Sequence, residues 1–217
     1  MNLFYHFGWA GSLVILAGCL ISGLPYRDRN GGKYSLFNHF ISELGEAGVS
    51  EKARAFNTGM VLGGLLFLPF IASIGWTLSG LWAILGMAAG LLAAGASVLV
   101  GIYSMERLEP HRKAAMTFFR SGLLTIIFFT VAVFRQPASQ QVIPLFVNGV
   151  GLLAIAAYAS FLVIVSRKTN KKGEENYILD PSVNKTRPRF WITAFLEWTL
   201  FFATIAWFLC VSLALIF

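Results

Sequence analysis

Charge is scarce in this sequence. Only 12% of its 217 residues are charged, whereas 57% are hydrophobic. Soluble globular domains carry about 25% charged residues, so the composition excludes that class. The only two cysteines, Cys19 and Cys210, do not form a disulfide framework. No Lys or Arg precedes Arg27, although cleavable signal peptides begin with positive charge, so we expect the first apolar segment to remain as a helix.

Long apolar segments account for most of the chain. A bilayer core about 30 Å thick requires roughly 20 apolar residues per spanning helix. Segments of that length lie at about 4–24, 57–77, 80–104, 114–134, 142–166 and 190–217. They leave no room for a separate soluble domain. The sequence therefore predicts an all-α, polytopic membrane protein with six transmembrane helices in a single domain, residues 1–217.

The basic residues are grouped. Every Lys and Arg except Arg135 lies within residues 27–54, 107–120 or 167–189. Cationic loops stay on the cytoplasmic side, so we expect cytoplasmic basic loops and both termini outside the cytoplasm. Because the basic residues adjoin helix ends, where they meet anionic headgroups, we expect membrane lipids as partners and no nucleic acid. The connection 167–189 is predicted to be a solvated tether.

Small residues dominate the third apolar segment. Gly86 and Gly90 form a GxxxG pair, which lets helix backbones approach closely in lipid. The pattern favours a tightly packed central helix. Its alternative is a homo-oligomer formed through the same small-residue face.

A short amphipathic pattern separates the first two spans. Ser35 is a good N-cap, and Gly45 stands where helices commonly end. At helical spacing the apolar side chains fall on one arc and the polar ones on the other, the polar set being Asn38, His39, Ser42 and Glu43. The pattern predicts an interfacial helix over 35–44. Its polar face either meets solvent or forms a polar floor beneath the helix bundle.

Three polar residues are expected within the cytoplasmic half of the spans: Asn57, Arg120 and Glu197. Ionisable groups inside a membrane are costly and suggest function. We hypothesise an Arg120–Glu197 ion pair, because pairing would relieve two buried charges. The predicted ligand-binding residues are Asn38, Ser42, Asn57, Arg120 and Glu197.

His39, Glu43 and His111 are the candidates for catalysis. Imidazole and carboxylate groups suit zinc, and two ligands four residues apart on one helix can join a third from another helix. The chain has no HExxH motif, so a hydrogen-bonded structural cluster is the favoured interpretation and no cofactor is expected. A zinc site and a proton or headgroup site remain the alternatives.

Two motifs resemble those of a multipass membrane family, domain of unknown function 998. The first reads Tyr34-Ser35-x-x-Asn38-x-x-Ile41-Ser42-Glu43-Leu44-Gly45, followed by Asn57 and Gly59. The second comprises Gly101, His111 and Phe118-Phe119. The sequence departs from the family pattern at Ile102-Tyr103-Ser104, where a Gly-Phe-Pro-like turn is expected. The resemblance implies six membrane helices and supplies no activity.

These features favour a membrane protein that binds a lipid headgroup or small amphiphile in a polar site in the cytoplasmic half of the bundle. One alternative is an intramembrane lipid hydrolase or transferase that uses a metal or acid–base chemistry. Another is a small proton-coupled transporter using Glu197. Whether the protein is an enzyme does not follow from the sequence.

Overall fold

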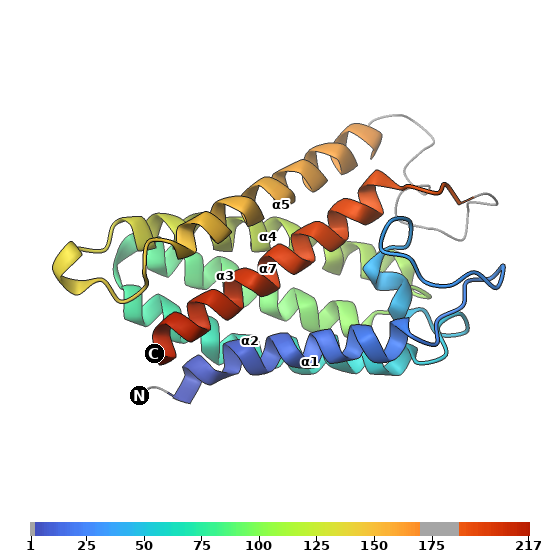
Figure 1. The fold of residues 1–217 in the computed structure, drawn as a ribbon, viewed down its shortest axis with the longest axis horizontal. Coiled ribbons are helices and arrows are strands. Elements are labelled where there is room, and N and C mark those ends of the chain that lie inside the picture. The colour runs from blue at the N-terminus through green and yellow to red at the C-terminus, as the bar shows by residue number, and fades with distance from the viewer. Residues whose placement is uncertain (1–2, 170–186) are drawn as a thin grey trace.

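The fold consists of helices joined by loops (Figure 1). The computed structural model describes residues 3–169 and 187–217. Its long helices are α1 (His6–Gly23), α2 (Ala53–Leu78), α3 (Gly80–Ile102), α4 (Leu108–Phe134), α5 (Val147–Thr169) and α7 (Ile192–Ile216). Short 3-10 helices are η1 (Leu3–Tyr5), η2 (Ile41–Gly45) and η3 (Ala138–Gln140). Six helices in this part of the chain are long and apolar enough to cross a membrane, which confirms the predicted fold class.

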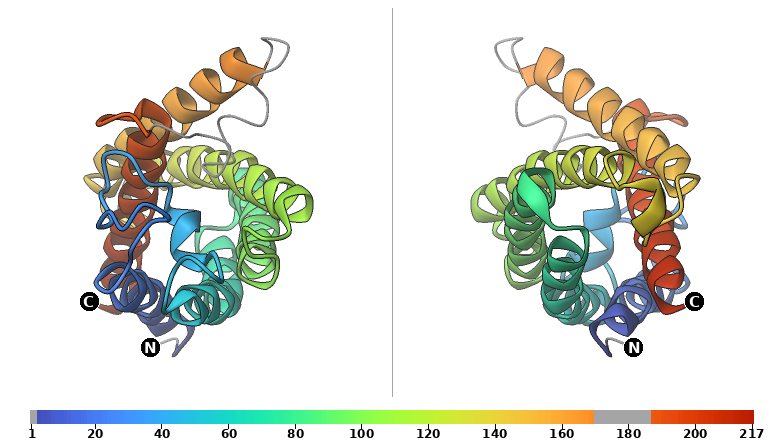
Figure 2. Two further views of the ribbon diagram at one scale, coloured as in Figure 1. Left: turned by 90° about the vertical axis from the view of Figure 1, so that its right-hand side faces the viewer. Right: turned by 90° about the vertical axis from the view of Figure 1, so that its left-hand side faces the viewer.

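The long helices form a closed ring. Each one contacts the next along the chain, and α7 returns to contact α1. Figure 2 shows this ring from both ends. Helix α5 tilts away from the ring toward its C-terminal end (Figures 1 and 2). The side chains that fill the centre of the ring therefore determine where a ligand could bind.

The two ends of the ring differ. Both termini and the connection containing η3 lie at one end, which we call the terminus end (Figure 1). Residues 24–52 and 103–107 lie at the other, which we call the loop end. Apart from Arg135, which follows α4 at the terminus end, the basic residues that flank the described helices therefore gather at the loop end. Residues 170–186 of the predicted tether lie outside the described residues.

Glycines set the closest helix approaches. A Cβ on Gly18 of α1 would lie 2.9 Å from the Ala55 carbonyl oxygen of α2. On α3, Gly86 packs against Phe129, and Gly90 against Ile71 and Thr125. Both α3 glycines therefore pack inside the ring, in agreement with the packed-helix interpretation. A homo-oligomer stays a prediction.

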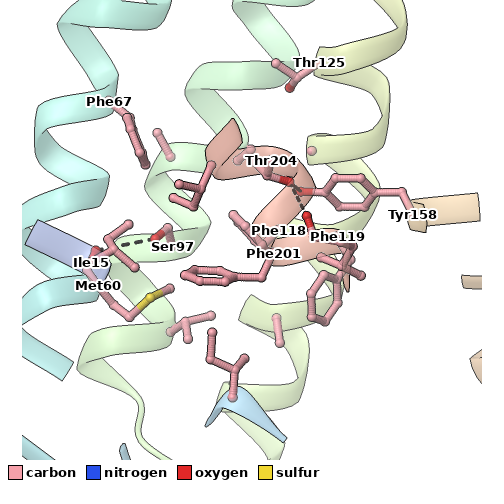
Figure 3. A pocket seen from close by; sticks show the side chains of 18 of the residues that line it. Ile15, Met60, Phe67, Ser97, Phe118, Phe119, Thr125, Tyr158, Phe201 and Thr204 are labelled. Atoms are coloured by element: carbon pink, nitrogen blue, oxygen red, sulfur yellow. Dashed lines mark hydrogen bonds between the residues drawn. The ribbon is translucent and has the colours of Figure 1, made fainter. Parts of the chain in front are cut away.

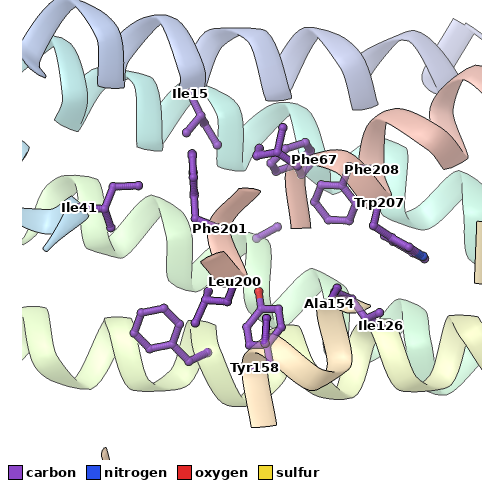
Figure 4. Close-up of a cluster of buried hydrophobic side chains, with 14 of the residues drawn as sticks. Ile15, Ile41, Phe67, Ile126, Ala154, Tyr158, Leu200, Phe201, Trp207 and Phe208 are labelled. Atoms are coloured by element: carbon purple, nitrogen blue, oxygen red, sulfur yellow. The ribbon is translucent and has the colours of Figure 1, made fainter. Parts of the chain in front are cut away.

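Aromatic side chains fill the half of the ring toward the terminus end. The rings of Phe67 and Phe208 lie 4.5 Å apart between centroids, and Phe208 also contacts Phe70 and Trp207. Figure 4 shows the buried cluster extending from Ile41 to Trp207. Burial of such large rings stabilises the bundle.

The predicted helix over 35–44 is wrong in detail. The chain forms a turn at 36–38, a bend at His39, an extended residue at Phe40, and then η2. A continuous helix would pair its own backbone groups. Here Glu43 Oε1 accepts the Phe40 N–H at 2.7 Å, and Glu197 Oε2 accepts the Ile41 N–H at 2.9 Å. The two carboxylates therefore accept backbone N–H groups that a continuous helix over 35–44 would pair within itself. We call residues 34–45 the cap, because they lie across the loop end of the ring (Figure 2).

Helix α5 also begins later than the sequence predicts. The helix begins at Val147, whereas the sequence predicted a span from 142. The Gln136 side chain explains the difference, since its Oε1 accepts the N–H groups of Val142 and Ile143 and its Nε2 donates to the Ile143 carbonyl. These bonds hold the preceding residues in a loop.

Candidate functional site

A cavity lies in the centre of the ring, on the side of the cap. The space between its lining atoms, counted together with the part that is open to solvent, is about 920 Å³. All six long helices and the cap contribute side chains. Figure 3 shows Ile15 and Met60 on one side of it and Phe118 and Phe119 on the other. The apolar lining consists of Ile15, Ile41, Phe56, Met60, Phe67, Ile71, Ala93, Ala94, Val100, Ala115, Phe118, Phe119, Ile126, Leu200, Phe201, Ile205 and Phe208.

The hydroxyl groups along the walls have partners within the protein. Ser97 donates to the Met60 carbonyl, and Thr125 donates to the Ser121 carbonyl. The hydroxyls of Thr204 and Tyr158 hydrogen-bond to each other at 3.0 Å, as Figure 3 shows. Because their polar atoms are engaged, these residues behave as part of an apolar wall.

The polar end of the cavity lies against the cap. It is formed by Glu197 of α7, His111 of α4 and Ser42 of the cap. Glu197 is 5% exposed, and it lies five positions into α7, about 8 Å along the helix. The His111 Nδ1 lies 2.6 Å from the Tyr103 carbonyl oxygen. Since a carbonyl only accepts, Nδ1 carries the proton and Nε2 is left as an acceptor.

A smaller pocket of about 340 Å³ adjoins this polar end. It shares His111, Ser42 and Glu197 with the main cavity. Ala115 and Phe119 of α4 also line both, and the remaining lining residues belong to the cap, to α4 and to the loop before it: Phe40, Met105, Leu108, Arg112 and Met116. The two pockets therefore adjoin each other at the polar end of the cavity, beside α4.

A buried ion pair holds the cap to the start of α7. Glu43 is 1% exposed, and Arg187 binds both of its carboxylate oxygens, at 2.9 and 3.1 Å. Arg187 also donates to the Asn38 carbonyl at 2.6 Å and lies over the Trp191 ring. Burial raises the pKa of Glu43, while Arg187 opposes that shift. The bidentate pair fixes the position of the cap.

Tyr34 and Trp198 add to this attachment. Trp198 Nε1 donates to the Tyr34 hydroxyl and to the His39 carbonyl, both at 3.1 Å. Tyr34 donates to the Phe40 carbonyl at 2.8 Å. Backbone carbonyl groups of the cap that have no helical hydrogen bond thus accept hydrogen bonds from side chains of α7 and of the cap itself.

His39 is a structural member of the cap. It is 2% exposed and stacks on Tyr34, with ring centroids 5.0 Å apart. Its Nδ1 accepts the Ser35 N–H at 3.2 Å, and its Nε2 faces Asp28 Oδ2 at 3.6 Å. Burial, reinforced by the nearby Arg187 charge, lowers the pKa of His39 to about 4. His39 is therefore neutral at physiological pH.

The remaining predicted ligand residues are dispersed. Asn57 Nδ2 donates to the Gly45 carbonyl at 3.0 Å and so anchors the end of the cap. Asn38 Nδ2 donates to the Pro188 carbonyl at 3.2 Å. Arg120 is exposed on α4, whereas Glu197 is buried and accepts the Ile41 N–H. The hypothesis of an Arg120–Glu197 ion pair is therefore wrong. Of the predicted ligand residues, Ser42 and Glu197 lie at the cavity.

The structure also separates the three catalytic candidates. His111 lines the cavity, whereas Glu43 and His39 belong to the cap network. Within the described residues, no group of three or more His, Cys, Asp or Glu side chains could hold a metal ion. His39 and Glu43 each form hydrogen bonds within the cap.

Sequence reasoning missed the role of Arg187. The residue was assigned to a solvated tether because it stands in a polar, basic segment. A signal was available, since a carboxylate such as Glu43, next to apolar residues, requires a cation when it is buried. The pairing partner could not be chosen from the sequence among the many basic residues of the same end.

Comparisons with known proteins identify the family and nothing further. Residues 9–214 match the family described as "Protein of unknown function (DUF998)". No curated protein and no solved structure matches the chain. The match covers nearly the whole chain: most of α1 and α7, the other long helices completely, and the cap. The protein therefore belongs to the DUF998 family of membrane proteins.

Proposed function

We propose that this protein binds an amphiphilic molecule whose apolar chain occupies the cavity and whose head lies at the polar end beside the cap. The observation that carries this proposal is the cavity itself. Its walls are apolar or internally hydrogen-bonded, and its available polar groups gather at one end. An amphiphile has the same division between a chain and a head.

The adjoining pocket supports entry from the loop end. Its lining extends from Met105, in the loop before α4, to the polar groups that would receive the head. By the distribution of basic residues, the loop end faces the cytoplasm and its anionic lipid headgroups. The ligand would therefore enter from the cytoplasmic leaflet with its apolar chain leading, and its head would stay at the polar end. The proposed headgroup residues are Ser42, His111 and Glu197.

Native mass spectrometry of the detergent-purified protein tests the proposal. Ala93→Phe places a ring in the cavity, because Ala93 lines it and is 7% exposed. Leu92→Phe is the matched control, because Leu92 precedes it on α3 and is 57% exposed on the outer surface. We expect a bound amphiphile in the wild type and in Leu92→Phe, and its loss in Ala93→Phe. Equal occupancy in all three proteins would refute binding in the cavity.

A further inference from the structure

Glu197 is a buried carboxylate without a cation. It is 5% exposed, and its Oε2 accepts one hydrogen bond, from the Ile41 N–H. Among the described residues no Lys, Arg or His forms an ion pair with it, and the nearby Arg187 is engaged with Glu43. A buried carboxylate is costly unless a cation and further hydrogen bonds compensate it. The second oxygen of Glu197 has neither.

The other two groups at the polar end are also able to accept hydrogen bonds. His111 Nδ1 is committed to the Tyr103 carbonyl, so its Nε2 offers a lone pair. The Ser42 hydroxyl lines both pockets and has no partner among the described residues. Three acceptors from α7, α4 and the cap therefore converge where the ligand head would lie.

We infer that the ligand carries a cationic amino head, a primary ammonium on a long apolar chain. An ammonium has three donors and one positive charge, which matches three acceptors of which one is an unpaired carboxylate. Charge-assisted hydrogen bonds of this kind are stronger than neutral ones. The inference rests on the proposed function, because it specifies the head of the molecule that the cavity would hold.

Equilibrium dialysis with amphiphiles of equal chain length distinguishes the contribution of the head to the affinity from that of the chain. The delipidated protein in a zwitterionic amphipol is dialysed against dodecylammonium, dodecanol or dodecanoate at neutral pH, with protein-free amphipol as the blank. We expect the wild type to bind dodecylammonium at least about tenfold more tightly than the other two. Glu197→Gln should abolish this advantage while the affinity for dodecanol is kept. Glutamine can still accept the Ile41 N–H, so the cap bond is retained.

Glu46→Gln is the matched control for charge at the loop end. Glu46 pairs with the exposed Arg29 at 2.7 Å and does not line the cavity. It should leave the preference for dodecylammonium unchanged. Equal affinity for all three amphiphiles would overturn the amino-head inference and leave the proposed function standing. A preference for dodecanoate, directed to Arg112 in the adjoining pocket, would overturn it too. Binding of none of the three would overturn both.

Discussion

Single residues at the loop end have roles set by the partners they reach. Glu43 and Glu197 are both buried carboxylates, yet one is bound by Arg187 and the other by a single backbone N–H. Their positions in the sequence suggested the opposite, since Glu43 was a candidate for catalysis and Glu197 for an ion pair. Each of these contacts joins residues more than 140 positions apart in the sequence. The fold determines which residues meet, and hydrophobic patterns alone do not specify it.

Replacing Glu43 tests the buried pair. Glu43→Gln leaves the largely buried Arg187 without a counter-charge, so we expect the free energy of unfolding to fall by about 2–3 kcal/mol. A double-mutant cycle with Arg187→Gln should give a coupling of more than about 1 kcal/mol. Unfolding by SDS in mixed micelles measures both. Glu46→Gln removes a surface pair and should change stability by less than about 0.5 kcal/mol. A loss no larger for Glu43→Gln than for Glu46→Gln would show that the cap merely meets solvent.

His39 predicts a pH dependence. Its folded pKa of about 4 lies below the ordinary value of about 6.5, so on acidification the unfolded chain takes up the proton first. The stability due to neutral His39 is complete above pH 6.5 and is lost as the pH falls toward 4, by up to about 3 kcal/mol. Asn can replace Nδ1 as the acceptor for the Ser35 N–H. His39→Asn should therefore weaken the pH dependence of the unfolding free energy between pH 6.5 and 4. An unchanged dependence would show that other titrating groups cause it.

At the scale of elements, the sequence predicted the helices better than the cap. Long apolar runs fix the membrane helices because the bilayer leaves no alternative partner for their backbone. The cap lies outside that constraint, and side chains such as Glu197 and Trp198 satisfy its backbone from another helix. An amphipathic pattern over 35–44 could not reveal this competition, because the competing residues lie about 150 positions away.

Gly45 should be required where the cap meets α2. A Cβ at this position would collide with Asn57 Oδ1 and would lie 2.8 Å from Phe56 Cδ1. Gly45→Ala is expected to destabilise the protein by about 1–3 kcal/mol, measured by SDS unfolding. Gly95→Ala is the control, since nothing lies within 4 Å of its Cβ position and alanine favours helix. An equal change in the free energy of unfolding for the two variants would contradict the close contact between the cap and α2.

At the scale of the whole molecule, composition and charge predicted the membrane fold and the grouping of the basic loops at one end. They could not reveal the closed ring or its cavity. The apolar residues that line the cavity belong to the same periodic pattern as those that fill the core at the terminus end. Ile15 and Ile74 are both buried, but Ile15 lines the cavity and Ile74 does not, and nothing in their local sequence distinguishes them.

Orientation is testable by cysteine labelling. In a background with Cys19 and Cys210 replaced by Ala, Ala47→Cys reports on the loop end and Ala138→Cys on the terminus end; both positions are exposed. Because cationic loops remain cytoplasmic, a membrane-impermeant maleimide should label Ala138→Cys in intact cells and Ala47→Cys only after permeabilisation. The reverse pattern would place the basic loops outside.

The most direct test of amphiphile binding is an experimental density map of the protein in a lipid nanodisc. We expect elongated density between Ile15 and Phe118, ending within hydrogen-bond distance of Glu197. A ring closed around an empty or collapsed cavity, with Phe201 packed against the α4 side chains and water alone beside Glu197, would contradict it.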